Sequence, residues 1–497
     1  MSDESINNNL ELSEAELNEQ MRIRREKLAE LFKRGRSPFS IRKFARNSSA
    51  VKIAENFDSM EGSDVKIAGR IMTWRNMGKA NFINIADFTG SIQVYVRMND
   101  IGEEAFTEFK TWDIGDIIGV SGKVFRTRTG EISVHAYEIE LLAKALIPLP
   151  EKFHGLKDAD MRYRQRYLDI IMNGELKDLF IKKQVFWSAI RNFLSEKGFL
   201  EVETPILEVN AGGAAAAPFK THHNALDIDV FLRISMGELW QKKLLVAGFD
   251  KTFEIGRQFR NEGMSYEHLQ DYTQFEFYWA YADCSDGRNL VQELYREVTR
   301  AVTGGSKFKS RGFEIDMDKE WEIYDFEATI KEKLGIGIYD ADIDEIKAKL
   351  NELGVAYDPK LNYWRLVDVL WKVVRKDLSG PGFLVGQPIE LNPLPKRLKD
   401  DPRKADQIQI IVAGTELGNG YAELNDPLDL ENRFKEQRVM GEAGDADAHN
   451  HDQDFIDAIK YGMPPAFGFG VSERLFSVLM DKSMRECVLF PLMKPEK

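Results

Sequence analysis

The stretch at residues 253–283 constrains the fold of this chain more than any other segment. Aromatic residues alternate there with polar or small ones, a period of two that indicates a half-buried β-strand. The aromatic set is Phe275, Phe277 and Trp279. A second apolar-sided segment precedes it at residues 253–259, and the loop between them is polar. We therefore predict a strand, a polar loop and a returning strand that pair as an antiparallel hairpin.

The predicted hairpin carries ionisable side chains at places that a ligand can reach. Its loop contains Arg260, Glu262 and His268, and Glu276 and Tyr278 share one face of the returning strand. Arg is the side chain best suited to two-point contact with a phosphate, so the hairpin suits a polyanionic ligand beside a small polar one. A salt-bridged surface hairpin is the alternative, and this stretch alone does not choose between the two.

The order of these residues resembles the second signature motif of class II aminoacyl-tRNA synthetases. The sequence FRNEG at residues 259–263 is followed by His268 and then by the Glu and Tyr of the strand. In that family the motif binds ATP, and two companion motifs accompany it. Residues 198–205, GFLEVETP, match the first motif, which forms the dimer interface in the family. Residues 462–475 supply the third motif, with its glycines and Arg474.

Two further segments narrow the resemblance to the class II lysyl-tRNA synthetases. They are residues 211–224, with GGA and THHN, and residues 414–427, GTELGNGYAELNDP. The resemblance implies an α+β fold with an N-terminal OB-fold β-barrel. A class II core follows, with an antiparallel six-stranded sheet flanked by helices and with a helical insertion. It also implies a homodimer that uses ATP and Mg²⁺ to join L-lysine to tRNA-Lys, by way of lysyl-adenylate and pyrophosphate.

The resemblance also assigns roles to individual residues. The positions implied for catalysis are Arg260, Glu262, His268 and Arg474. Those implied for ATP binding are the same four with Tyr272. Those implied for lysine are Gly213, Glu238, Glu276, Tyr278, Asn419 and Glu423. Those implied for the metal are Glu416, Glu423 and Gln409, the last at a position where the family usually has Glu.

Charge supports lysine as the amino acid. In the resembled fold the strand with Glu423 lies beside the strand with Glu276 and Tyr278, which implies two carboxylates and a phenol around one small pocket. Such a pocket demands a cationic partner. Without one, the like charges would push a proton onto one carboxylate. A lysine ammonium offers three donors for these three acceptors, whereas an aspartate side chain would be repelled. An aspartyl- or asparaginyl-type enzyme of the same architecture is the nearer alternative, and a non-catalytic tRNA-binding paralogue is the more distant one.

The chain departs from the family pattern at three places. Where the family commonly has Arg before the motif's His, this chain has Glu267, so that an acid replaces a base near the terminal phosphates. Gln409 replaces a usual metal-binding Glu, and the third motif lacks one family glycine before Glu473. These changes predict either a divergent subfamily or reduced activity.

Residues 65–142 predict a small β-barrel, because short alternating strands are separated by Gly-bearing turns. Phe82 and Gln93 are expected on its outer surface, where an exposed aromatic with polar neighbours fits a base-stacking face. A stray surface aromatic is the alternative. The segment is similar to the anticodon-binding barrel of lysyl-tRNA synthetases. This similarity implies that Phe82 stacks on an anticodon base while Arg75, Gln93 and Glu131 read base edges.

The length and the charge distribution of the chain indicate how it divides into domains. A chain of 497 residues is too long for a single core. The predicted parts are a basic helical extension at 1–60, an anticodon-binding OB-fold at 61–147, a linker at 148–175 and a catalytic domain at 176–497, with the insertion at about 300–400. Residues 21–46 hold ten basic residues against two acidic ones, an excess that favours contact with tRNA over the alternative of a solvated helix face.

Composition excludes several other classes. The net charge of −13 argues against indiscriminate binding of nucleic acid. The two cysteines are too few to suggest a disulfide framework or a zinc site. No segment is apolar over the length that a bilayer requires, and the acidic first residues do not suggest a secretory signal. We therefore expect a cytoplasmic protein without a membrane partner.

Overall fold

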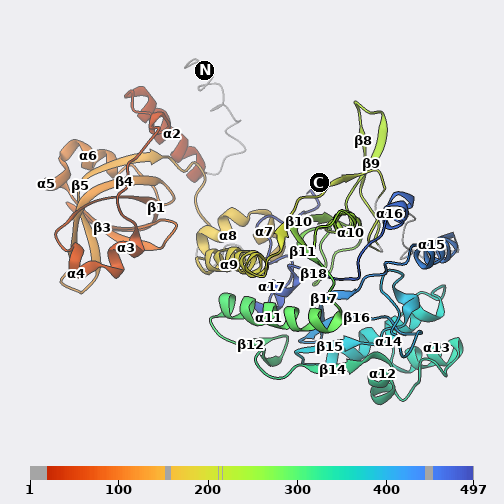
Figure 1. Ribbon diagram of the computed structural model, residues 1–497. Coiled ribbons are helices and arrows are strands. Elements are labelled where there is room, and N and C mark those ends of the chain that lie inside the picture. Colours follow the sequence, from red (N-terminus) through yellow and green to blue (C-terminus); the bar gives the residue numbers. More distant parts are fainter. Residues whose placement is uncertain (1–18, 151–157, 211, 215, 443–451, 496–497) are drawn as a thin grey trace. The chain divides into compact units, whose positions relative to one another are not determined.

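The structure is a computed structural model that describes residues 19–150, 158–210, 212–214, 216–442 and 452–495. The chain divides into two compact units, Met1–Gly174 and Glu175–Lys497 (Figure 1). Within the described ranges, no helix is both long and apolar enough to cross a membrane. The predicted part boundaries at residues 60, 147 and 175 remain predictions.

The first unit contains a closed barrel, which confirms the predicted OB-fold. Its strands follow the order β1–β2–β3–β5–β4 and are antiparallel except for the pair β3 and β5. The bounds are β1 Asp64–Met77, β2 Ala80–Ala86, β3 Ser91–Arg97, β4 Ile117–Arg126 and β5 Ile132–Ala143. Alternate side chains point inward, so Ile83, Val94 and Val134 are fully buried in the barrel core.

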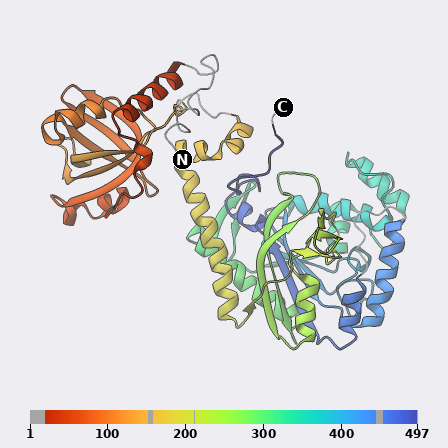
Figure 2. The same ribbon diagram turned by 90° about the horizontal axis from the view of Figure 1, so that it is seen from above.

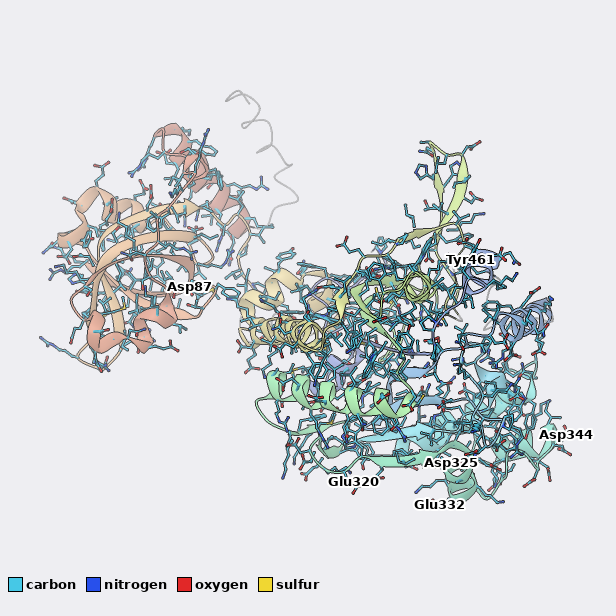
Figure 3. The ribbon with its side chains drawn as sticks, in the orientation of Figure 1. Asp87, Glu320, Asp325, Glu332, Asp344 and Tyr461 are labelled. Atoms are coloured by element: carbon cyan, nitrogen blue, oxygen red, sulfur yellow. The ribbon has the colours of Figure 1, made fainter. Side chains whose placement is uncertain are left out.

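The helices of the first unit are short. They are α2 Glu19–Lys33, η2 Pro38–Ser40, α3 Ala50–Glu55, α4 Phe57–Met60, α5 Met98–Ile101, α6 Glu103–Phe109, α7 Ala159–Arg164 and α8 Arg166–Met172. Asp87, in the turn between β2 and β3, accepts a hydrogen bond from the backbone N–H of Ala50 at 2.9 Å (Figure 3). This contact ties the start of α3 to the barrel.

The basic run at residues 21–46 is partly used inside the first unit. The buried Arg24 donates hydrogen bonds to the backbone carbonyls of Ile114 and Ala145, each at 3.0 Å, and Lys27 pairs with Asp113 at 2.7 Å. These cations fasten α2 to the barrel. Fewer of the ten bases are therefore available to a nucleic acid than the sequence count suggests.

The second unit is built on an eight-stranded sheet in the order β14–β15–β16–β17–β18–β11–β10–β6. The bounds are β6 Leu200–Glu201, β10 Lys251–Phe259, β11 Asp271–Ala280, β14 Glu322–Asp325, β15 Gly382–Val385, β16 Gln407–Val412, β17 Thr415–Ala422 and β18 Ala466–Ser472. The six central strands pair antiparallel, as predicted. Two short edge strands, β6 and β14, pair parallel with their neighbours; they are too short to show a period in the sequence.

The two faces of this sheet have different partners. Phe275 and Phe277 of β11 point into a core shared with helices α9 (Glu175–Glu196) and α11 (Cys284–Thr303). Figure 2 shows α9, in yellow, running alongside the sheet. Because side chains alternate along a strand, Glu276 and Tyr278 point to the opposite face, where Tyr278 packs with helix α10 (Glu238–Val246). The alternation predicted at this hairpin is confirmed, and it reserves one face of the sheet for polar groups.

Smaller elements complete the second unit. A three-stranded sheet contains β7 Leu207–Glu208, β8 Lys220–His223 and β9 Ile228–Leu232. The later helices are α15 Pro427–Glu442, α16 Gln453–Ile459 and α17 Arg474–Leu479.

The insertion at residues 300–400 contains helices, as predicted, and also strands, which the sequence did not indicate. It contains helices α12 Phe326–Leu334, α13 Ile343–Glu352 and α14 Tyr363–Val374, the turns η3 Arg375–Asp377 and η4 Ile389–Leu391, and a hairpin of β12 Lys307–Ser310 and β13 Phe313–Asp316. Asp325 caps the start of α12 (Figure 3). The insertion also supplies β14 and β15, and Trp371 of α14 shares an apolar cluster with Ile411 of β16. It is therefore part of the central sheet.

Candidate functional site

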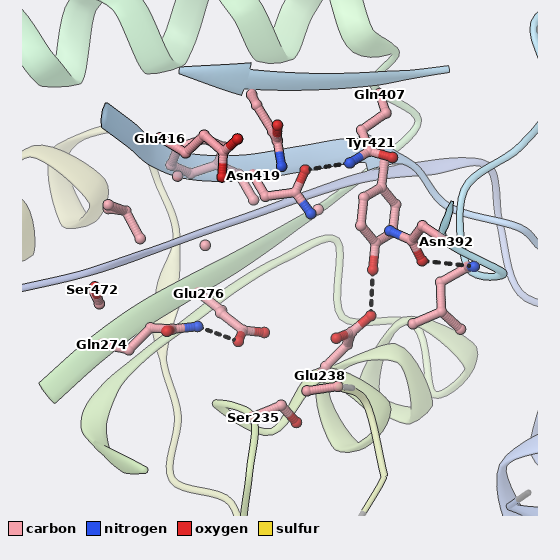
Figure 4. Close-up of a pocket in the computed structure, with 18 of the residues that line it drawn as sticks. Ser235, Glu238, Gln274, Glu276, Asn392, Gln407, Glu416, Asn419, Tyr421 and Ser472 are labelled. Atoms are coloured by element: carbon pink, nitrogen blue, oxygen red, sulfur yellow. Dashed lines mark hydrogen bonds between the residues drawn. The ribbon is translucent and has the colours of Figure 1, made fainter. Parts of the chain in front are cut away.

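A cavity of 440 Å³ lies on the polar face of the central sheet (Figure 4). Its walls come from β11, β16, β17 and β18, from the start of α10, and from α14 and the segment after β15 in the insertion. Eleven residues predicted for the site line it: Gly213, Glu238, Arg260, Tyr272, Glu276, Tyr278, Gln409, Glu416, Asn419, Glu423 and Arg474. Glu262 and His268 are not among the lining residues.

One end of the cavity is acidic and closely hydrogen-bonded. Glu276 accepts hydrogen bonds from the backbone N–H of Met236 at 3.0 Å, from Gln274 at 2.7 Å and from the hydroxyl of Tyr278 at 2.9 Å. At the same end Tyr421 donates its hydroxyl hydrogen to Glu238, the first residue of α10 (Figure 4). These hydrogen bonds therefore hold the carboxylates of Glu276, on β11, and Glu238, on α10, in fixed orientations.

Glu423 is the third carboxylate of this acidic end. It is 1% exposed, and neither of its oxygens accepts a hydrogen bond of acceptable geometry from the described residues. Its charge is opposed by the ammonium of Lys242, whose Nζ lies 2.7 Å from Oε2. A buried carboxylate with open acceptor positions is costly unless a ligand supplies donors, so Glu423 marks a place for a cationic group.

Glycines of the third motif make room for these carboxylates. A Cβ at Gly468 would lie 2.1 Å from Oε1 of Glu423, and a Cβ at Gly470 would lie 2.7 Å from Cγ of Glu276. Both positions on β18 therefore require Gly. These two glycines therefore lie against the acidic end of the cavity.

The surroundings of the acidic end change the pKa values of its ionisable groups. Burial raises the pKa of Glu276, and the charge of Glu238 acts in the same direction. Burial also raises the pKa of Glu423, although the ammonium of Lys242 opposes the shift. Burial alone would lower the pKa of Lys242, but the charges of Glu238 and Glu423 raise it above its usual value. A cationic ligand would relieve the shifts at both carboxylates.

The other end of the cavity is basic. Arg260 follows β10, where its Nε donates to the backbone carbonyl of Ile234 at 3.2 Å, and Arg474 begins α17, where its Nε donates to the backbone carbonyl of Glu267 at 3.2 Å. Tyr272 of β11 lies at this end and bonds to Gln258 across the hairpin. Two guanidinium groups and a phenol ring on one side of a cavity suit a nucleotide with several phosphates.

His268 lies beside this basic end. Its Nδ1 is 2.7 Å from the hydroxyl of Ser265. The surrounding protein desolvates the imidazole, although part of the ring is exposed, and the charges of Arg474, Arg260 and Arg375 act in the same direction. Together they lower the pKa of His268 to about 4. Glu262, by contrast, is exposed.

Glu267, the acid that replaces a family base, is held by arginines from outside the three motifs. Arg311 donates to its carboxylate, and Nη2 of Arg375 lies 3.8 Å from it. Burial alone would raise the pKa of Glu267, but the charges of Arg311, Arg474 and Arg375 lower it. The region therefore keeps an excess of positive charge despite the acid at position 267.

A β-bulge aims the predicted metal ligands at the cavity. Gln409 pairs with Asn419 and Ile411 pairs with Glu416, so that β17 contains one residue more than β16 between these pairs. The extra residue turns Glu416 to the same face as Asn419. The bulge needs Gly418, whose φ is +109° and whose Cβ would lie 2.5 Å from the ring of Phe469.

Two of the predicted metal ligands, Glu416 and Glu423, are well separated along the chain. Glu423 is seven residues after Glu416, a span of about 23 Å in an extended chain at roughly 3.3 Å per residue. Figure 4 accordingly shows Glu416 at the far side of the cavity from Glu238, the residue that shares Lys242 with Glu423. This separation favours the lysine role of Glu423 over its metal role, which stays a prediction. Among the described residues there is no cluster of three or more His, Cys, Asp or Glu side chains that fits a metal.

Glu416 and Gln409 nevertheless fit a hard cation that arrives with a nucleotide. Mg²⁺ is usually held by one or two protein oxygens together with substrate phosphates and water. Glu416 accepts a hydrogen bond from the indole N–H of Trp371 at 2.8 Å. Nε of Arg375 lies 3.6 Å from the bonded oxygen. One carboxylate and one amide oxygen suffice for such an ion.

Several site residues were not predicted from the sequence. Lys242 lies in a run of two lysines on α10 and looks like an exposed charge, and Trp371 looks like an ordinary core residue of α14. The insertion also lines the cavity with Arg365, Asp368, Gln387 and Asn392. A spacing of three residues along α14 places Arg365, Asp368 and Trp371 on one face, but nothing local indicates that this face meets β17.

The predicted base-reading residues lie on the outer face of the barrel. Phe82 is half-buried against Tyr95, with ring centroids 4.8 Å apart, and Arg75 pairs with Phe82 across β1 and β2. Arg75 and Glu131 are exposed. The expectation of an exposed Gln93 is wrong: it is 9% exposed, because β5 lies alongside and Ser133 donates to its Oε1 at 2.8 Å.

Comparison with known families gives two matches. Residues 158–494 match the family described as tRNA synthetases class II (D, K and N). Residues 65–142 match the family described as OB-fold nucleic acid binding domain. The second match covers the barrel, and the first contains the whole central sheet and its cavity.

Curated relatives are similar over nearly their full length. A lysine–tRNA ligase of Pelotomaculum thermopropionicum is 48% identical over 490 residues, which cover 97% of this chain and 96% of the relative. A lysine–tRNA ligase of Clostridium perfringens is 43% identical over 509 residues and covers 100% of both chains. One of Thermoanaerobacter pseudethanolicus is 44% identical over 499 residues, which cover 100% of this chain and 99% of the relative.

Proposed function

Because this chain belongs to the class II tRNA synthetases of the D, K and N group, we propose that it is a lysine–tRNA ligase. It activates L-lysine with ATP to lysyl-adenylate and pyrophosphate. It then transfers the lysyl group to a ribose hydroxyl at the 3′ end of tRNA-Lys. The reaction belongs to translation, and the proposal includes a cytoplasmic location.

The observation that carries the choice of lysine is the buried acidic end of the cavity. Glu276 and Glu423 are 6% and 1% exposed, and the ammonium of Lys242 is the one cationic group that the described residues place against Glu423, so acceptor positions of Glu423 stay open. A lysine ε-ammonium supplies up to three donors and one positive charge. An aspartate side chain would add a fourth negative group to Glu238, Glu276 and Glu423, and an asparagine amide would leave their charge uncompensated.

The geometry supports a division of labour along the cavity. Glu238 binds the α-amino group close to the backbone of Gly213, where a Cβ would lie 3.1 Å from the Cβ of Glu238. Glu276, Tyr278 and Glu423 bind the ε-ammonium, and Asn419 lies on the wall between the two ends. The lysine carboxylate then points to the basic end. There it attacks the α-phosphorus of ATP while pyrophosphate leaves.

The basic end positions ATP and stabilises the charge that develops. Arg260 and Arg474 hold the phosphates, and Tyr272 lies against the adenine ring. Glu416 and Gln409 would hold Mg²⁺, which neutralises phosphate charge when it is bound with ATP. Glu262 and His268, which lie in the loop between β10 and β11 beside this end, would add contacts to the nucleotide.

The remaining proposed partners are tRNA and a second copy of the chain. The anticodon contacts Phe82 and Arg75 on the outer face of the barrel, with Glu131 at its edge. Gln93 reaches a base only by exchanging its bond to Ser133. A homodimer would form through α9 and β6, the elements of the first motif. Exposed apolar residues such as Ile181 and Leu200 lie there at 42% and 51% exposure.

ATP–pyrophosphate exchange with each of the twenty amino acids tests the proposal. Exchange should depend on lysine, with ornithine as a weak second substrate. Arg260→Ala should abolish it, because the loss of a contact to developing charge costs about 3–4 kcal/mol. Preferential activation of aspartate or asparagine would favour the sister enzymes, and exchange with none of the twenty would favour a non-catalytic tRNA-binding protein.

A further inference from the structure

Lys242 lies behind the wall of the cavity and joins two of its carboxylates. Its Nζ is 2.9 Å from Oε1 of Glu238 and 2.7 Å from Oε2 of Glu423. The side chain is 2% exposed, and Lys242 is not among the residues that line the cavity. The ammonium therefore contacts both carboxylates without occupying the space that a ligand would take.

The position of this ammonium is determined from several sides. Glu238 and Lys242 are one helical turn apart on α10, which places them on the same face. The rings of Tyr278, Tyr421 and Phe455 surround Nζ, with centroid distances of 5.8, 5.5 and 5.8 Å. Aromatic faces attract a desolvated cation. Lys242 thus links α10 to the segment after β17 through a rigid, enclosed contact.

The charges at this end of the cavity do not balance within the protein. Glu238, Glu276 and Glu423 contribute three carboxylates, and Lys242 contributes one ammonium. With all three carboxylates ionised, two negative charges remain in a buried space, where uncompensated charge is costly. A diamino acid brings two ammonium groups, one for Glu238 and one for Glu423. An amino acid with a neutral side chain brings only one.

We propose that Lys242 is a positioning residue for lysine: it fixes Glu238 and Glu423 at the spacing of the two amino groups of the substrate. This inference rests on the proposed function and deepens it. Lys242 does not touch the substrate. It acts through the two carboxylates, which would otherwise repel each other and turn away from the ligand.

Lys242→Met tests this role, because Met removes the charge and keeps an unbranched side chain. In pyrophosphate exchange, the KM for lysine should rise roughly 10²-fold, as expected when a buried charge loses its partner. The KM for ATP and the rate at saturating lysine should stay within a fewfold of wild type, since the basic end is unchanged. Lys243→Met is the matched control: the neighbouring Lys243 pairs with the exposed Asp454 and should leave all three values unchanged.

A double variant separates positioning from simple structural support. Glu423→Gln should itself raise the KM for lysine. If Lys242 works through Glu423, adding Lys242→Met to Glu423→Gln should raise the KM only slightly further. The double variant also removes both charges of the ion pair. It should therefore fold more readily than a variant that leaves one charge buried and unpaired. Its thermal unfolding is compared with that of wild type.

Two outcomes overturn the proposal. The first would be fully additive effects of Lys242→Met and Glu423→Gln on the KM for lysine. The second would be a Lys242→Met variant with a lower melting temperature but the wild-type KM for lysine. Failure of the proposed function looks different, because the wild-type protein itself would then show no lysine-dependent exchange.

Discussion

His268 illustrates how a single residue responds to its neighbours at the basic end of the cavity. Its pKa of about 4 keeps the imidazole neutral at pH 7. The family resemblance assigns this position to ATP binding, and a neutral ring donates only one hydrogen bond. The charge state of His268 therefore depends on whether a polyanion offsets the arginines around it.

We predict that ATP binding takes up a proton at His268 between about pH 4 and pH 6.5. The bound phosphates counter the charges of Arg474 and Arg260, so they favour the imidazolium and raise the lowered pKa towards its usual value. Titration calorimetry of ATP at pH 5.5, in two buffers with different ionisation enthalpies, measures the uptake.

His268→Asn controls for protons that bind to ATP itself. The variant should show less uptake than wild type at pH 5.5, and the two proteins should agree at pH 8, where the imidazole is neutral with or without ATP. Equal uptake in both proteins at pH 5.5 would mean that the phosphates do not come near His268.

At the scale of elements, helix α14 acts on the cavity through one side chain. The indole N–H of Trp371 donates to Glu416 at 2.8 Å, while Arg375, at the end of the same helix, lies 3.6 Å from that carboxylate. The hydrogen bond from Trp371 thereby keeps the Glu416 carboxylate from moving closer to the guanidinium of Arg375. The insertion thus helps to orient Glu416, one of the two residues proposed to hold Mg²⁺.

Trp371→Phe should raise the Mg²⁺ concentration needed for half-maximal exchange by about tenfold. A hydrogen bond to a charged group contributes about 1.5–3 kcal/mol, and without it Glu416 turns towards Arg375 and away from the ion. Trp364→Phe on the same helix is the matched control, because Trp364 packs against Tyr339 and Tyr363 and does not line the cavity. An equal Mg²⁺ requirement in both variants would contradict the role given to Trp371.

At the scale of the whole molecule, the two units have separate cores. The barrel core contains Ile83 and Val94, and the core of the second unit contains Phe275 and Phe277. A substitution on the surface of the barrel leaves the second core intact. The two units can therefore carry separable parts of one activity.

Phe82→Ala should lower tRNA charging while pyrophosphate exchange stays at the wild-type level. A base stacked on an aromatic ring contributes about 1–3 kcal/mol, so the loss in charging efficiency should lie between about 5-fold and 150-fold. Phe88→Ala is the control, since Phe88 is 68% exposed in the turn between β2 and β3. A parallel loss in both assays would show that Phe82 supports the barrel and does not contact the anticodon.

The amino-acid sequence by itself determined the parts of this protein that local patterns encode. The alternation of Phe275 and Phe277 with Glu276 and Tyr278 predicted which side chains meet the core and which face a ligand. The barrel followed in the same way from alternation between residues 65 and 142. These predictions succeed because the two faces of a strand follow from a period of two along the chain.

Only the tertiary structure decided how distant residues combine. Glu423 was predicted to bind both lysine and the metal. In the structure most of β17 lies between Glu416 and Glu423, and Glu423 forms an ion pair with Lys242. Trp371 reaches Glu416 only because the insertion packs against the sheet. Likewise, Gln93 is buried because β5 lies beside β3. Such contacts depend on the packing of elements, which no local spacing in the sequence records.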